Sequence, residues 1–222
     1  MKLYDEAYFR KWYRDPGKRI VRRAETARKA AMALGVAEHL LGRRVGSVLD
    51  VGCGEGVWFP LLRALRPRVR YLGLDTSDYA VQRFGRSRNV RRGSWGRLSE
   101  LRFDDPFDLV VCSDALHYMR TSEIALGLEV LPELLAGVAY LDFLSTDDDL
   151  ETGIEGDLVG FKMRHASWYR RKFRTAGLVE CGLGFWAAPD LAPRLTALER
   201  AERSGLPDRR RRSRPFGGKI PP

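Results

Sequence analysis

The chain has 222 residues, of which 44% are hydrophobic, and its formal net charge is +10. This length and composition allow one sizeable core and no more than one full domain. No apolar run is long enough to span a bilayer, and the N-terminus is charged and aromatic, unlike a signal peptide. The cysteines, Cys53, Cys112 and Cys181, are far apart, which predicts buried thiols in a reducing cytoplasm, and no cysteine or histidine spacing predicts a metal site.

The positive charge is concentrated at the two ends. Residues 1–44 carry 12 basic and 5 acidic side chains, residues 190–222 carry 9 and 4, and the middle of the chain is close to neutral. Basic ends can mark a nucleic-acid partner. We prefer to interpret them as a solvated, arginine-rich surface, because no recognisable RNA-binding module accompanies the charge.

The first elements expected along the chain are two helices, over residues 5–14 and 18–41, separated by a Pro-Gly pair. Aromatic residues recur at i, i+4 spacing in the first helix and therefore gather on adjoining faces. Residues 1–44 are thus predicted to form a helical lid or cap, with Tyr8 and Trp12 as candidate substrate contacts.

Residues 48–56 then read VLDVGCGEG, a buried strand running into a glycine-rich turn, and a second strand at 71–74 ends on Asp75. Strand, glycine turn, helix, strand and acid is the order in which a doubly wound α/β sheet binds a nucleoside-bearing cofactor. The dinucleotide fingerprint G-x-G-x-x-G is not met, because Val57 stands where its third glycine belongs. The turn instead has G-x-G-x-G spacing, with Gly52, Gly54 and Gly56.

This stretch resembles the first motif of the class I S-adenosylmethionine-dependent methyltransferases, and Asp75 resembles their second. The resemblance covers roughly residues 45–187 and implies a Rossmann-like, doubly wound, mostly parallel sheet of about seven strands with helices on both faces. It also implies S-adenosyl-L-methionine as cofactor, with Asp75 on the ribose hydroxyls and Asp50 behind the turn. An ordinary strand-to-helix turn with a capping acid is the competing interpretation. The expected cofactor contacts are Asp50, Gly52, Cys53, Gly54, Gly56, Asp75, Thr76, Ser94, Trp95, Ser113 and Asp114.

The remaining elements alternate between helix and strand, which favours a parallel sheet with right-handed crossovers. The expected helices are residues 56–65, 77–84, 121–135 and 165–176, and the expected strands are residues 90–92, 107–113, 137–144 and 178–187.

The loops after the third and fourth strands complete the expected pocket. Ser94 stands where the resembling family often has an acid near adenine, and Trp95 is either a wall of the pocket or a core residue. In the segment after the fourth strand, His117 is expected to face the substrate and to serve as general base, unless it is a packing or capping residue. The acidic stretch from Asp147 onward either recruits an amine or is a solvated loop. The expected substrate contacts are Tyr8, Trp12, His117, Tyr118, Asp147 and Trp168.

The C-terminal part departs from the resembling family, whose last strand follows the sixth directly and lies antiparallel beside it. Here residues 191–203 predict a helix, and only residues 212–220, a poor strand by propensity, remain to supply a seventh strand. We therefore expect a methyltransferase core over 45–189, and over 190–222 a basic helix and tail that can supply the last strand.

The sequence predicts a cytoplasmic S-adenosylmethionine-dependent methyltransferase. Its expected substrate is a small molecule, methylated on oxygen or nitrogen, as in specialised-metabolite biosynthesis. Two alternatives stay open. One is an RNA methyltransferase whose basic ends grip phosphates, and the other is a non-catalytic nucleoside- or partner-binding protein on the same fold.

Overall fold

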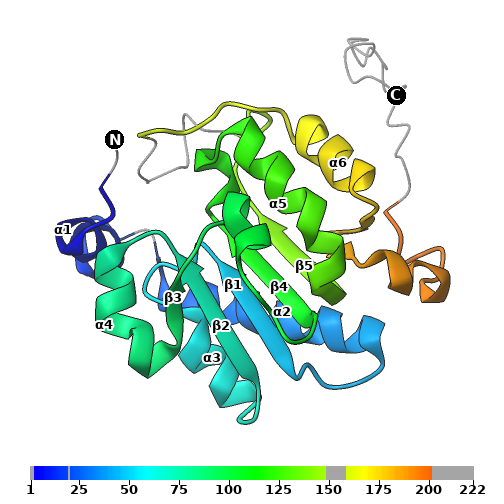
Figure 1. Ribbon diagram of the computed structural model, residues 1–222, viewed down its shortest axis with the longest axis horizontal. Coiled ribbons are helices and arrows are strands. Elements are labelled where there is room, and N and C mark those ends of the chain that lie inside the picture. Colours follow the sequence, from blue (N-terminus) through cyan, green and yellow to red (C-terminus); the bar gives the residue numbers. More distant parts are fainter. Residues whose placement is uncertain (1–2, 20, 149–158, 202–222) are drawn as a thin grey trace, which may run out of the picture.

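The computed structural model describes residues 3–19, 21–148 and 159–201. Seven strands form one sheet in the order β3-β2-β1-β4-β5-β7-β6, and only β7 runs antiparallel to its neighbours (Figure 1). The expected mostly parallel, doubly wound sheet is confirmed. The strands are β1 Ser47–Val51, β2 Arg70–Asp75, β3 Val90–Arg92, β4 Phe107–Ser113, β5 Leu135–Asp142, β6 Val179–Gly182 and β7 Phe185–Ala187.

Helices cover both faces of this sheet (Figure 1). One core cluster joins the sheet to α5 and α6 through side chains such as Leu128 and Phe173, and a second joins the opposite face to α2 and α3 through Leu34 and Leu62. Strands buried on both sides are mostly apolar, as β4 and β5 are apart from Asp108, Ser113 and Asp142 near their ends. The α-helices are α1 Glu6–Phe9, α2 Arg23–Leu41, α3 Trp58–Leu65, α4 Asp78–Arg88, α5 Thr121–Leu134 and α6 Ala166–Thr175, joined by a π-helical turn at Arg10–Arg14 and by 3-10 turns at Trp95–Glu100, Leu116–Tyr118 and Pro189–Arg194.

The parallel pairing brings the carboxyl ends of β1, β2 and β4 to one edge of the sheet. Val51 of β1 is paired with Leu74 of β2, and Asp50 is paired with Val111 of β4. The loops that follow these three strands therefore emerge side by side. In doubly wound sheets this edge is where ligands bind.

The last strand lies where no pattern in the sequence predicted a separate strand. Residues 178–187 form β6 and β7 rather than the single strand expected, and the two-residue turn between them has positive φ at both Leu183 (50°) and Gly184 (81°). β7 enters between β5 and β6 and pairs antiparallel with both. In the part of the chain that the structure describes, β7 is therefore the antiparallel strand, and residues 212–220, the expected candidate for it, lie outside the described residues.

Two helix expectations also need correction. The second helix begins at Arg23 rather than at residue 18, because residues 16–18 form a turn. The helix expected over 191–203 is a 3-10 turn over Pro189–Arg194, and Pro193 inside it lacks the N–H that a regular helix would need. Within the part of the chain that the structure describes, no helix is both long and apolar enough to cross a membrane.

Candidate active site

The glycine turn after β1 adopts a backbone that favours glycine at each position. Gly52, Gly54 and Gly56 have φ values of 78°, 54° and 66°, in the left-handed region that a Cβ disfavours. A Cβ on Gly52 would lie 2.7 Å from the Cβ of Ala115 in the loop after β4. On Gly56 it would lie 3.0 Å from Val90 Cγ2, so this glycine serves packing rather than a ligand.

Asp75 at the end of β2 ties this turn to the next helix. Its Oδ2 accepts a hydrogen bond from the Gly54 N–H at 2.7 Å, and its Oδ1 accepts one from the Ser77 N–H at 2.8 Å. Burial raises the pKa of Asp75, while these N–H groups oppose the rise. A carboxylate oxygen has more than one acceptor position, so Asp75 can also accept from a diol such as that of ribose.

Asp50 lies behind the turn, as expected. Its side chain is buried, and the Tyr71 hydroxyl donates a hydrogen bond to its Oδ2 at 2.7 Å. Burial raises the pKa of Asp50 to about 7. Cys53 is buried close by and packs with Phe84 and Val90. Both residues shape the floor beneath the turn, outside the pocket lining that the described residues form.

A pocket of about 250 Å³ opens between the glycine turn, the loops after β3 and β4, and the N-terminal segment. Many of the predicted contacts meet there: Tyr8, Gly52, Gly54, Asp75, Thr76, Ser94, Trp95, Asp114 and Tyr118. Trp95 is also fully buried and donates its indole N–H to the Ile124 carbonyl at 3.2 Å. Trp95 is therefore both a wall of the pocket and a core residue. Ser113 lies behind the lining and donates to Asp142 Oδ2 at 3.1 Å.

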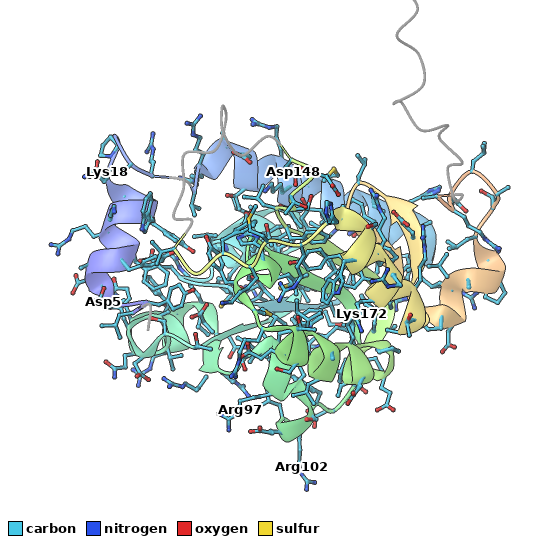
Figure 2. The ribbon with its side chains drawn as sticks, turned by 90° about the horizontal axis from the view of Figure 1, so that it is seen from above. Asp5, Lys18, Arg97, Arg102, Asp148 and Lys172 are labelled. Atoms are coloured by element: carbon cyan, nitrogen blue, oxygen red, sulfur yellow. The ribbon has the colours of Figure 1, made fainter. Side chains whose placement is uncertain are left out.

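The N-terminal segment packs directly over the glycine turn. Phe9 is buried and stacks on Tyr79 of α4, with ring centroids 5.6 Å apart. The Tyr13 hydroxyl lies so close to Gly54 that no Cβ would fit there. Arg14 forms an ion pair with the buried Glu55 of the turn. Figure 2 shows Asp5 and Lys18 at the two ends of this segment, on the side away from Lys172 of α6. Only this first part of the chain lies over the turn, whereas α2 packs on the sheet as part of the core, so the expected cap over residues 1–44 stays a prediction.

Several expected substrate contacts lie elsewhere. Trp12 packs beneath Lys11, whose Nζ is 4.2 Å from the ring centroid, and Trp168 packs against Arg164. Asp147 accepts from the Ala166 N–H at 2.8 Å and pairs with the ring of His165, so it caps α6. None of the three belongs to the lining formed by residues 3–19, 21–148 and 159–201. The acids at 149, 151, 155 and 157 lie outside the described residues.

His117 is 2% exposed. Its Nδ1 accepts a hydrogen bond from the Leu144 N–H at 3.1 Å, and its ring stacks on Phe161 with centroids 4.9 Å apart. These contacts anchor the chain after β5 and place the ring outside the described pocket lining. The geometry therefore favours the packing alternative, and a general-base role stays a prediction to be tested.

Other residues of the lining were not predicted from the sequence. Glu123 is the clearest case: its carboxylate accepts from the Arg120 N–H at 2.7 Å and caps the start of α5. An acid three residues into a helix gives only the capping signal, which does not point to a pocket. The unpredicted lining residues are Tyr4, Phe9, Tyr13, Gly93, Gly96, Ala115, Met119 and Glu123.

Residues 49–137, which contain the glycine turn, Asp75 and the loops after β3 and β4, match the family model described as a methyltransferase domain. The chain carries a methyltransferase domain over these residues, and its activity is that of an S-adenosylmethionine-dependent methyltransferase. The site fits this cofactor, because Gly52, Gly54 and Asp75 line the pocket and Asp75 offers acceptors for the ribose.

Several solved structures have a fold similar to that of this chain, among them two named methyltransferases. The sugar N-methyltransferase KedS8 from a Streptoalloteichus species has a TM-score of 0.61 at 17% identity, covering 84% of this chain and 92% of its own. The amino pentose methyltransferase CalS10 from Micromonospora echinaspora has a TM-score of 0.58 at 18% identity, covering 85% and 99%. DesVI from Streptomyces venezuelae has a TM-score of 0.57 at 17% identity, covering 75% and 91%. The search of curated proteins found no match.

Proposed function

We propose that this methyltransferase transfers a methyl group to a nitrogen or oxygen of a small molecule, in the cytoplasm and within specialised-metabolite biosynthesis. The observation that carries the proposal is the pocket. It runs from Asp75 and the glycine turn to a wall made of Tyr8, Tyr118 and Met119. A concave site with aromatic walls and a few polar groups is typical of small-molecule binding.

The residues of the pocket suit this task. S-adenosylmethionine, when bound, supplies a methyl group already activated on a sulfonium, so the protein has to align the acceptor and exclude water. Gly52 and Gly54 line the pocket without side chains of their own, and Asp75 offers acceptors to the ribose. Tyr8 and Tyr118 offer aromatic faces that desolvate the acceptor, and Asp114 offers the carboxylate nearest them in the loop after β4.

The similar structures support a small substrate. KedS8 is named a sugar N-methyltransferase, and CalS10 is named an amino pentose methyltransferase involved in calicheamicin biosynthesis. Both align with most of this chain, the N-terminal part of which closes over the pocket. The cytoplasm fits the three cysteines, which are free thiols.

The test is a methyl-transfer screen with isotope-labelled S-adenosylmethionine, offered in parallel to a pool of amino and hydroxyl metabolites and to total RNA. We expect label in the small-molecule fraction only, and none with the Asp75→Ala variant. Labelled RNA, with binding that weakens steeply as salt rises, would overturn the proposal in favour of the basic ends acting on phosphates.

A further inference from the structure

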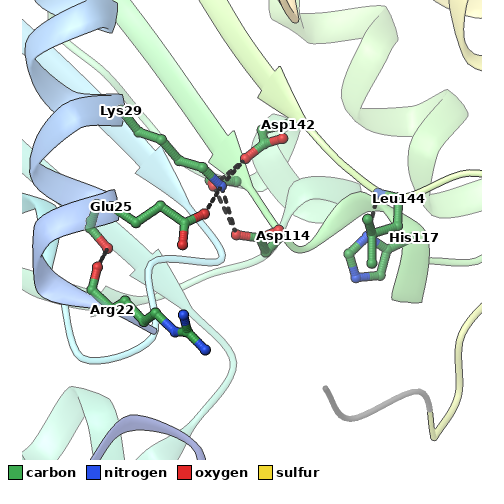
Figure 3. Close-up of polar contacts among 9 residues, drawn as sticks. Arg22, Glu25, Lys29, Asp114, His117, Asp142 and Leu144 are labelled. Carbon is green, nitrogen blue, oxygen red and sulfur yellow. Dashed lines mark hydrogen bonds and ion pairs between the residues drawn. The ribbon is translucent and has the colours of Figure 1, made fainter. Parts of the chain in front are cut away.

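A lysine of α2 contacts a carboxylate that lines the pocket, although the lysine itself is not part of the described lining. Lys29 of α2 places its Nζ 2.6 Å from Asp142 Oδ2 at the end of β5 and 3.5 Å from Asp114 Oδ2 in the loop after β4 (Figure 3). Glu25, one helical turn earlier, lies 3.7 Å away. The Lys29 side chain is only 24% exposed, so these contacts do not belong to a freely solvated surface.

Asp114 is the member of this group that faces the pocket. It lines the pocket, and its side chain is 62% exposed. Its φ of 57° is left-handed, and its N–H donates to the Asp142 carbonyl at 2.8 Å. The Ser113 hydroxyl lies between the two carboxylates, 3.2 Å from Asp114 Oδ2 and 3.1 Å from Asp142 Oδ2. Backbone and hydroxyl together hold two like charges close to one another.

Two neighbouring carboxylates repel each other unless a cation lies between them. Burial disfavours the Lys29 ammonium, but Asp114 and Asp142 outweigh it and raise the pKa of Lys29, so the amine stays charged. The pKa of Asp114 is raised by the protein atoms crowded around it and by Asp142, and Lys29 opposes that rise. The other titratable groups facing the cluster are Tyr140 and Cys112, whose pKa values burial raises, so neither adds a charge near neutral pH.

We propose that Lys29 is a positioning residue, which holds Asp114 as a charged carboxylate directed into the pocket to accept a hydrogen bond from the acceptor's N–H or O–H. The identity of the acceptor rests on the proposed function. The effect of Lys29 on the charge of Asp114 is independent of the proposed function, because it follows from contacts within the chain.

The experiment compares Lys29→Gln and Lys29→Arg with the unchanged protein. Carboxyl carbon NMR, assigned with Asp114→Asn, follows the titration of Asp114. In Lys29→Gln, loss of the nearby cation should raise the apparent pKa of Asp114 by about one unit or more. In Lys29→Arg, the cation is kept and this pKa should return to its value in the unchanged protein. On the acidic limb of the rate profile, methylation should fall about tenfold in Lys29→Gln, because a pKa about one unit higher displaces that limb to higher pH. Binding of S-adenosylhomocysteine should change less than about twofold.

A matched control lies at the opposite edge of the same sheet. Arg43, just after α2, binds Asp108 of β4 with two hydrogen bonds of 2.9 and 2.7 Å. Arg43→Gln removes a comparable ion pair and should lower the melting temperature without moving the Asp114 titration or the rate profile. If Lys29→Gln also leaves the Asp114 titration and the pH profile of the rate unchanged, Lys29 is only structural and the inference is wrong. If no small molecule is methylated, the proposed function fails, and the titration still decides the role of Lys29.

Discussion

Asp50 should make the folded protein lose stability as the pH rises. The side chain is 2% exposed beneath the glycine turn, and its single described hydrogen bond comes from the Tyr71 hydroxyl. Burial raises its pKa from 3.8 to about 7. The folded protein therefore keeps a proton on Asp50 at pH values where the unfolded chain has released it. The contribution of protonated Asp50 to the free energy of unfolding is fully present below about pH 4 and is lost as the pH rises through about 7.

The size of the effect follows from the two pKa values. A difference from 3.8 to about 7 corresponds to roughly 4 kcal/mol over the whole titration, at 1.36 kcal/mol per unit. Between pH 5 and pH 8 the same linkage gives a loss of about 2.5 kcal/mol. Because the group is almost fully buried, screening by solvent should reduce this little.

The assay is urea unfolding at pH 5, 6, 7 and 8 for the protein and for Asp50→Asn. Asparagine keeps an acceptor for Tyr71 and cannot ionise, so the difference between the two proteins isolates Asp50. We expect similar stability at pH 5 after allowance for the substitution itself, and a relative gain for Asp50→Asn of about 2.5 kcal/mol by pH 8.

Asp108 provides a control of opposite sign. Although burial alone would raise its pKa, hydrogen bonds from Arg43 and Gly46 lower it below the ordinary value. Asp108→Asn should therefore lose stability near neutral pH, where Asp50→Asn gains it. If the two Asp50 proteins instead show parallel pH profiles, Asp50 is ionised in the folded state, and the reasoning from burial fails.

Three further changes test the site. Asp75→Ala should weaken S-adenosylhomocysteine binding by about 1.5–3 kcal/mol, the scale of hydrogen bonds to a charged group, and unchanged affinity in calorimetry would contradict its assignment. Arg14→Met leaves the buried Glu55 carboxylate without its ion-pair partner. Because the Arg14 side chain is 43% exposed, we expect a loss of only about 1–2 kcal/mol in the free energy of unfolding, together with weaker cofactor binding. A loss of stability without weaker cofactor binding would argue against the cap. His117→Asn keeps an acceptor for the Leu144 N–H, so turnover should stay within about tenfold; a hundredfold loss with unchanged cofactor affinity would establish the general base.

Most of the sheet could be predicted because its strands carry local signals. β4 is apolar at nearly every position, as a strand covered on both faces must be, and Ser77 caps α4 with its side chain, as its position before the helix suggested. Such signals need only a few neighbouring residues. The short β7 gave none, because Leu183 at positive φ is not a typical turn residue. Only its pairing with β5 and β6 makes it a strand.

The cofactor side of the pocket could be predicted for a related reason. Gly52, Gly54 and Asp75 lie within 25 residues of one another in a fixed order, and the geometry of one βαβ unit determines where they meet. Asp50, Cys53 and Gly56 belong to the same motif but act from behind the lining. Spacing identified the motif, but it did not distinguish residues that face the pocket from those that support it.

The substrate side is assembled from segments that no local rule connects. Tyr8 and Trp12 have equivalent spacing in the sequence, yet the first lines the pocket and the second packs beneath Lys11. The difference arises from how the N-terminal segment docks on α4, which depends on Phe9 stacking on Tyr79 and on the Arg14 ion pair. The same holds for Lys29, which meets Asp114 and Asp142 because α2 packs along β4 and β5 and places this residue near their carboxyl ends. If the proposed function holds, substrate choice depends on such tertiary contacts, and variants that alter docking without touching the pocket, such as Arg14→Met, should change which acceptors are used.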